Sequence, residues 1–258
     1  MLRLLDARSR SYVEIRPARA GLLRVCAHAP ETAQEADLTG LRVLLVADLL
    51  ARVAELRHLQ VLVVVAFAGQ PPAQLTEFEQ ATGALGLHSP QARAGHDDAR
   101  TALDGPIDVH LVSERGAAEA AVEGLAVPVG VARAEPPGHD NLRSHPLAAK
   151  FALLSVAYDQ PADLTDKQLT EAGDTVRRWR RQVAEWAELP SRPMAAGTAA
   201  AIRSAFDDLD TVRALALLRD LSLDADAPAG AKFETFLYAD RVLGLDLPSE
   251  IGRPRELS

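Results

Sequence analysis

Cysteine, lysine and aromatic residues are all scarce in this sequence. Among 258 residues there is one cysteine, Cys26, and aromatic side chains make up 4% of the chain. A single cysteine excludes an internal disulfide and fits a reducing cytoplasm. Because few aromatic rings are present, the core has to be built from the aliphatic residues that dominate the 48% hydrophobic fraction.

Long apolar runs are also missing. The most apolar stretch, residues 61–68, is far shorter than the ~20 residues that a membrane helix needs. Residues 1–6 show no charged segment leading into an apolar one, so we expect neither a signal peptide nor a membrane anchor. The net charge of −8 repels phosphate, which argues against a large nucleic-acid surface but leaves room for a local basic stripe.

The first half of the chain alternates between short β-branched runs and helical stretches. Residues 60–68 form a nearly continuous apolar run, which is typical of a strand buried on both faces of a parallel sheet. Strands that alternate with helices indicate a parallel βαβ arrangement. The pattern predicts strands at 23–25, 60–68, 107–112 and 127–131, and helices at 41–59, 74–85 and 116–124.

The second half of the chain is helical throughout. Two prolines and a glycine mark a boundary within residues 134–143. We therefore predict an α/β fold, with a Rossmann-like parallel sheet in residues 1–135 and a helical bundle in residues 136–258. The helices are expected at 145–157, at 165–189 with its N-cap near Thr165, and at 197–207, 211–221 and 229–243, the last ending near Gly244.

Several segments, in this order, resemble the cysteinyl-tRNA synthetases, a class I aminoacyl-tRNA synthetase family. The opening, MLRLLD at 1–6 followed by LRVC at 23–26, is similar to the family's start, where a short strand pair leads into a zinc-binding cysteine. The other matches are ADLTGLRV at 36–43, HPLAAKFALLSVAY at 145–158, FDDLDTVRAL at 206–215 and ADRVLGLDL at 239–247. The same motifs occur in the sister cysteine ligase of mycothiol synthesis. The chain is much shorter than a full synthetase, so the resemblance implies a truncated, degenerate homologue.

The resemblance places an ATP site at the head of the helix near residue 40. The family holds ATP there with a His-x-Gly-His turn, whereas this chain has Asp37-Leu38-Thr39-Gly40. Both histidines are gone, and Asp37 would oppose phosphate with like charge. The competing interpretation is structural: Asp37 or Thr39 caps the helix, and Gly40 opens it.

The family's second phosphate-binding element is a Lys-Met-Ser-Lys-Ser loop, which has no counterpart here. No lysine occurs before Lys150, and only residues 135–144 remain where the loop would lie. Arg133, Arg143 and Lys150 are the cations that stand nearest in sequence to the missing loop. For Arg143 the simpler interpretation is a surface residue.

Zinc is not expected from the sequence. The family binds it through two cysteines, a histidine and a glutamate, and Cys26 is the only retained candidate. An improvised set of Cys26, His28, His110 and Glu114 competes with the commoner case of a buried cysteine acting as a small hydrophobe.

Two further features bear on ligands. His110 stands where the family has an active-site strand end, but the glycines that follow it there are missing, so we place His110 with Asp37, Thr39 and Gly40 in a remnant ATP or ligand pocket. The basic run at 177–181 surrounds Trp179 and has the residue types that bind phosphate and stack on a base. The alternative is an amphipathic helix with Trp179 or Trp186 packed inward.

We therefore expect a cysteinyl-tRNA synthetase-like protein that lacks aminoacylation activity and acts as a binding or accessory module. A protein partner or a small ligand is expected, with a homodimer as a candidate assembly, no membrane contact and a cytoplasmic location. No catalytic residue and no cofactor are assigned, ATP being the one candidate. The alternatives are an ATP-dependent ligase that activates cysteine or another amino acid at a rebuilt site, and a tRNA-binding accessory protein.

Overall fold

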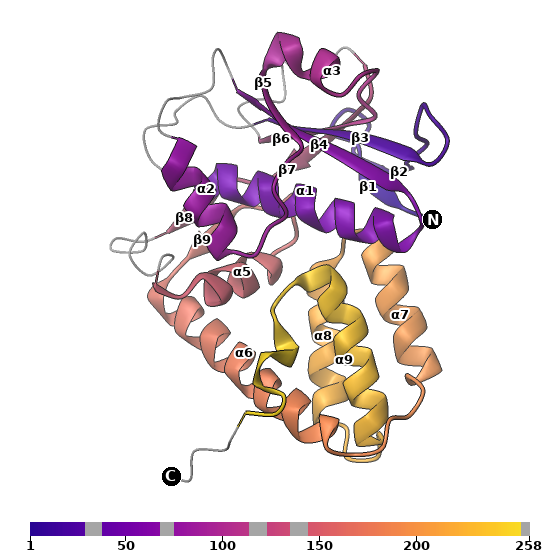
Figure 1. Cartoon of the computed structure of the whole chain (residues 1–258), viewed down its shortest axis with the longest axis vertical. Coiled ribbons are helices and arrows are strands. Elements are labelled where there is room, and N and C mark those ends of the chain that lie inside the picture. The colour runs from indigo at the N-terminus through magenta and orange to yellow at the C-terminus, as the bar shows by residue number, and fades with distance from the viewer. Residues whose placement is uncertain (29–37, 68–74, 114–122, 135–143, 254–258) are drawn as a thin grey trace.

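The computed structural model describes residues 1–28, 38–67, 75–113, 123–134 and 144–253 (Figure 1). A parallel sheet occupies the first half of the chain, and the described residues of the second half are mostly helical. Helix α1 (Leu38–Leu56) lies between the sheet and the helices (Figure 1). The predicted boundary between the two halves, at residue 135, lies outside the described residues.

The sheet has five parallel strands in the order β5-β4-β3-β6-β7. In sequence order, β3 forms the middle strand of this sheet, β4 and β5 follow on one side of it, and β6 and β7 then follow on the other side. This is a doubly wound sheet whose switch point lies between β3 and β6, and it confirms the predicted α/β class. The strands are β3 (Leu22–His28), β4 (Gln60–Phe67), β5 (Ala92–Gly95), β6 (Val109–Ser113) and β7 (Leu125–Val129).

The two faces of this sheet pack against different helices. Val25 and Ala27 belong to the main core, which includes α1, whereas Cys26 packs with Ala99 and Leu103 at α3 (Ala99–Ala102). Successive residues of a strand point to opposite faces, so Cys26 lies on the side away from α1. We call these sides the α1 face and the α3 face. α2 (Leu75–Ala84) and the short η1 (His96–Asp98) also belong to this half.

Two pairs of short strands flank the sheet. β1 (Arg3–Leu5) and β2 (Tyr12–Glu14) form an antiparallel pair near the N-terminus, as expected from the resemblance. β8 (Ala132–Ala134) pairs with β9 (Ala162–Leu164) in parallel. The sequence did not predict β8 or β9, because three-residue strands are too short to show a two-residue alternation.

All five predicted helices of the second half are present, with ends that shift by three residues at most. Thr165 caps α6 in a capping box with Gln168, as expected, and α9 ends at Gly244 in the left-handed conformation. The helices are α5 (Pro146–Leu154), α6 (Asp166–Ala187), α7 (Ala196–Asp207), α8 (Thr211–Leu223) and α9 (Ala229–Leu243), followed by η2 (Leu247–Glu250).

Both tryptophans pack inward, which confirms that part of the prediction. The Trp179 ring is almost fully buried and meets Phe151 and Phe236 edge to face, with ring centroids 5.5 and 5.3 Å apart. Trp186 meets Phe236 in the same way, at 5.1 Å. Such contacts concentrate much of the chain's small aromatic content at one place in the helical core.

Several elements predicted in the first half are present with small shifts, whereas β5, η1 and α3 were not predicted. α1 begins at Leu38 rather than residue 41, and β6 and β7 each start two residues away from the predicted positions. The predicted helix at 116–124 falls mostly on residues 114–122, which lie outside the described part of the chain.

Candidate functional site

The head of α1 is the place where the sequence predicts a remnant ATP pocket. Thr39 lies within the first turn of the helix, so it is not the cap among the two N-cap candidates, Asp37 and Thr39. Its side chain is buried, and its hydroxyl donates to the carbonyl oxygen of Ala132 at 3.2 Å and accepts from the Ala132 amide at 3.1 Å. Gly40 is buried inside the same turn, and Asp37 lies outside the described residues. Thr39 therefore joins α1 to β8.

Arg42 lies one turn further along α1 and is 1% exposed. Burial lowers the pKa of its guanidinium to about 10. The guanidinium donates to the loop that precedes β8 and to the loop that follows α5. Its acceptors are the backbone carbonyls of Gly130, Val131, Val156, Ala157 and Gln160. Arg42 thus fastens two loops of the chain to α1.

Lys150, one of the cations nearest to the missing loop, is fully buried. Its ammonium donates to the carbonyl oxygen of Gly244 at 3.0 Å, and desolvation lowers its pKa to about 8. Lys150 is therefore closed to solvent and cannot reach a phosphate from its observed position. Arg133 is exposed and lies 3.9 Å from Asp163, and Arg143 lies outside the described residues.

The end of α9 is shaped by its contact with Lys150. Gly244 has φ of +59°, and a Cβ atom there would lie 2.7 Å from the Lys150 ammonium and 3.2 Å from the Arg52 guanidinium. Glycine adopts this left-handed backbone conformation without strain and, because it has no Cβ, leaves room for the Lys150 and Arg52 side chains. This junction ties α1, α5 and α9 together around buried charges.

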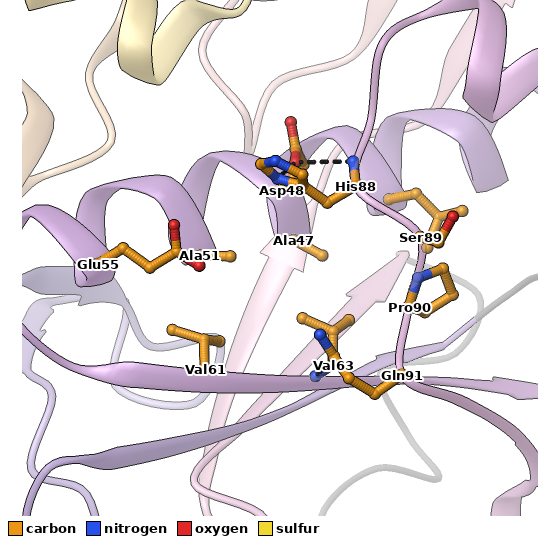
Figure 2. Close-up of a pocket in the computed structure, with 11 residues that line it drawn as sticks. Ala47, Asp48, Ala51, Glu55, Val61, Val63, His88, Ser89, Pro90 and Gln91 are labelled. Carbon is orange, nitrogen blue, oxygen red and sulfur yellow. Dashed lines mark hydrogen bonds and ion pairs between the residues drawn. The ribbon is translucent and has the colours of Figure 1, made fainter.

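A pocket of about 260 Å³ opens between α1, β4 and the segment before β5 (Figure 2). Asp48 and His88 meet on one side of it, above Val61 and Val63. One Asp48 carboxylate oxygen accepts from the His88 backbone amide at 3.1 Å and lies 2.8 Å from Nδ1 of the His88 ring. The other oxygen accepts from Arg52 at 2.8 Å. Both carboxylate oxygens are engaged, which indicates a structural ion pair. Sequence reasoning missed this pocket, for which the i, i+4 spacing of Asp48 and Arg52 was the one available signal.

On the α3 face, three side chains with metal-binding chemistry converge. Cys26 and His110 are paired neighbours across β3 and β6, and His28 ends β3 on the same side of the sheet. His110 is the second residue of β6, which runs from Val109 to Ser113, whereas the strand predicted at 107–112 had placed it toward the carboxyl end. His110 lies beside the carboxyl-terminal part of β3, at the switch point.

The two histidines are in direct contact. His28 Nε2 lies 3.0 Å from His110 Nδ1, and the rings are stacked with centroids 5.2 Å apart. One donor atom from each of Cys26, His28 and His110 lies within 4.8 Å of the others. Desolvation lowers the pKa of His110, while a hydrogen bond to the Glu123 backbone opposes that change. Desolvation also raises the pKa of the fully buried Cys26 thiol to about 12. Glu114, which we had weighed beside them, lies outside the described residues.

The basic run at 177–181 is partly engaged within the molecule. Arg180 donates to the Leu245 carbonyl at 2.9 Å and to the Asp246 carboxylate at 3.2 Å, and Arg177 pairs with Asp174. Two arginines of the predicted phosphate-binding face are thus held by carbonyl and carboxylate oxygens. This arrangement favours the amphipathic-helix interpretation of α6.

Comparison with known proteins relates this chain to the aminoacyl-tRNA synthetases. No protein-family model matches the chain. A stretch of 95 residues is 37% identical to a cysteine–tRNA ligase of Paracoccus denitrificans (strain Pd 1222). This match covers 35% of the chain and 19% of that protein, so the likeness concerns a small part of the relative's length.

The fold is similar to that of two solved structures. One is described as an arginyl-tRNA synthetase from Campylobacter jejuni, with a TM-score of 0.50, 10% identity, and coverage of 90% of each chain. The other is the arginyl-tRNA synthetase of Thermus thermophilus, with a TM-score of 0.51, 11% identity, and coverage of 94% of this chain and 84% of that one. At such low identity these likenesses concern the fold alone. Among the described residues, no helix is long and apolar enough to cross a membrane.

Proposed function

We propose that this chain, a partial homologue of cysteine–tRNA ligase with a class I synthetase-like fold, is a binding or accessory module that does not charge tRNA. The observation that carries this proposal is the use made of three polar side chains on the α1 side of the sheet. Thr39, Arg42 and Lys150 are all buried and all hydrogen-bonded to backbone groups. Groups of this kind would have to face the ligand in order to stabilise a transferring phosphate.

The sequence supports the same conclusion. The 258 residues contain neither a His-x-Gly-His turn nor a Lys-Met-Ser-Lys-Ser loop. Amino acid activation places extra negative charge on phosphate in the transition state, and preorganised cations or donors usually supply most of the rate enhancement. Lys150 cannot serve as such a cation while its ammonium is bound to Gly244, in the interior of the protein. We therefore assign the module a binding partner, either a protein or a small ligand, rather than an adenylation reaction.

The direct test is an ATP–pyrophosphate exchange assay with cysteine, repeated with the other amino acids. A cysteine–tRNA ligase assayed under the same conditions serves as the positive control. We expect exchange at the level of the protein-free blank for every amino acid. Exchange that depends on cysteine, or on any other single amino acid, would overturn the proposal in favour of an ATP-dependent ligase.

A tRNA-binding accessory role is the remaining alternative, and it predicts a measurable interaction with phosphate. Binding of tRNA that weakens steeply with salt would favour it, because released counterions give phosphate contacts this signature. The ion pairs of Arg177 and Arg180 and the net charge of −8 argue against that outcome. We expect no saturable tRNA binding at physiological salt. Sedimentation of the purified chain over a range of concentrations tests the homodimer.

A further inference from the structure

We propose that Cys26, His28 and His110 form a binding site for a zinc ion on the α3 face of the sheet. One thiol and two imidazoles converge there from two adjacent central strands. Sulfur and imidazole nitrogen are the ligand types that zinc prefers in proteins. Three protein ligands leave a fourth tetrahedral position for water or for an atom of a bound ligand, as in zinc sites that are not purely structural.

The observed distances are close to those that a tetrahedral ion requires. Zinc–nitrogen and zinc–sulfur bonds of the usual lengths place two ligand nitrogens about 3.3 Å apart, and a nitrogen about 3.5 Å from a sulfur. His28 Nε2 and His110 Nδ1 are 3.0 Å apart, and the donor atoms of all three residues lie within 4.8 Å of one another. The two nitrogens are already near the required separation, and closing the site around an ion requires the longer of the donor distances to shorten by rotation of the side chains.

The surroundings of His110 also suit a metal ligand. Its ring has a hydrogen bond to the Glu123 backbone as well as the contact between its Nδ1 and His28. Histidine ligands usually hold their second ring nitrogen in this way, which fixes the orientation of the imidazole. The Cys26 and His110 backbones are locked by the parallel pairing of β3 with β6, so two of the three donors are preorganised.

This donor set differs from the one that the resemblance implies. The synthetase family uses two cysteines, a histidine and a glutamate, and this chain has no second cysteine. Of the proposed ligands only Cys26 coincides with the family's set, and the two histidines are supplied by this chain's own strands β3 and β6. The site is therefore a separate arrangement, and its occupancy does not depend on whether the chain activates an amino acid.

Zinc binding is tested with the metal alone. The full chain is stripped with a chelator, dialysed against Zn²⁺ and analysed for metal content, and Co²⁺ is then substituted to record its absorption spectrum. We expect one metal per chain, with a charge-transfer band from a bound thiolate. Cys26→Ala, His28→Ala and His110→Ala should each weaken binding about tenfold or more, and Cys26→Ala should abolish the thiolate band.

His88→Ala is the matched control, because His88 is a histidine outside the cluster that pairs with Asp48. It should bind zinc as the unmodified chain does. His28 is only partly buried, so its variant keeps the test valid if the two core variants fail to fold. Absence of zinc from the folded chain, or equal zinc in His28→Ala and His88→Ala, would overturn the proposal. None of these readouts involves ATP, an amino acid or tRNA, so failure here is distinguishable from failure of the proposed function.

Discussion

The polar side chains on the α1 face and on the α3 face of the sheet have different kinds of partner. On the α1 side, Thr39 and Arg42 are bound to backbone groups and serve the architecture. On the α3 side, Cys26, His28 and His110 point their donor atoms at one another. Ligand chemistry and structural chemistry can therefore be separated by experiment. Substitutions on the α1 side should cost stability, whereas substitutions on the α3 side should cost metal binding.

The largest loss of stability is expected for Arg42→Met. The change leaves several buried carbonyls without their donor, and each unsatisfied group costs about 1–3 kcal/mol. Because the loops relax in part, we expect a loss on the order of 3–5 kcal/mol in the free energy of unfolding. Urea denaturation measures it. Arg42→Lys should also destabilise strongly, since an ammonium cannot reproduce the planar fork of donors.

Arg213→Met is the matched control, because Arg213 is exposed on α8. It should change stability by no more than about 0.5 kcal/mol. If Arg42→Met lowered the free energy of unfolding as little as this control does, the carbonyl contacts of Arg42 would contribute nothing to stability. The structural role proposed for the polar groups of the α1 side would then be wrong.

Lys150 gives a prediction about pH. Its pKa is about 8 in the folded chain against 10.5 for an ordinary lysine, so the folded state disfavours the charge. Below pH 8 Lys150 is protonated in both states, and burying its charge lowers the free energy of unfolding by the full amount. Between pH 8 and pH 10.5 Lys150 is protonated only in the unfolded chain, so this loss of stability disappears as the pH rises. The shift corresponds to about 3 kcal/mol at most. Relative to Lys150→Met, the unmodified chain should therefore gain stability between pH 8 and pH 10.5.

The measurement is the difference in unfolding free energy between the two proteins at several pH values, which cancels the titration of other groups. Lys167→Met serves as the control, since Lys167 is exposed on α6. Its difference from the unmodified chain should stay flat across the same range. A flat difference for Lys150→Met as well would mean that water or a counter-charge reaches the ammonium.

Thr39→Val should have an intermediate effect. Valine keeps the shape of threonine but loses the hydroxyl that both donates to and accepts from the Ala132 backbone. We expect a loss of about 1–2 kcal/mol, measured by thermal or urea denaturation. Thr170→Val, at an exposed position of α6, is the control. Equal losses in the two variants would remove Thr39 from the structural role given to it here.

The smallest effect is expected on the α3 face. In the metal-free chain, His28→Ala should change the free energy of unfolding by about 1 kcal/mol or less, because His28 is only partly buried. Added zinc should then stabilise the unmodified chain and leave His28→Ala unchanged, since an ion bound to the folded state alone adds to stability. A large loss in the free energy of unfolding of metal-free His28→Ala would show that the polar groups of the α3 face also stabilise the fold. The two faces would then not differ in the way proposed.

The sequence predicted the elements well where a local pattern is strong. The apolar run predicted at 60–68 forms a strand at Gln60–Phe67 that is buried over most of its length, and residues 229–243 form a helix that ends at a glycine, as expected. Local patterns carry no information about partners that are distant in the chain. Lys150 meets Gly244 across 94 positions, and His28 meets His110 across 82. Neither the burial of that lysine nor the convergence of the histidines follows from spacing, because both depend on strand register and helix packing.

The resemblance shows a similar limit. Matching segments in the expected order led to the fold, and the shared motif placed Thr39 and Gly40 at the head of α1. It could not show that the Thr39 hydroxyl is bound to β8, a strand of three residues that the sequence did not reveal. The resemblance included Arg42 in a matching segment, but it did not show that the Arg42 side chain binds two loops.

A calorimetric titration of the metal-free chain with ATP and with a non-hydrolysable cysteinyl-adenylate analogue tests whether the α1 side still binds an adenylate. Removing metal separates the α1 side from the proposed zinc site. If the polar groups of the α1 side are committed to the backbone, both ligands should give only heats of dilution. Saturable binding of the analogue at micromolar concentration or tighter would contradict the account, because it would mean that a working adenylate pocket survives.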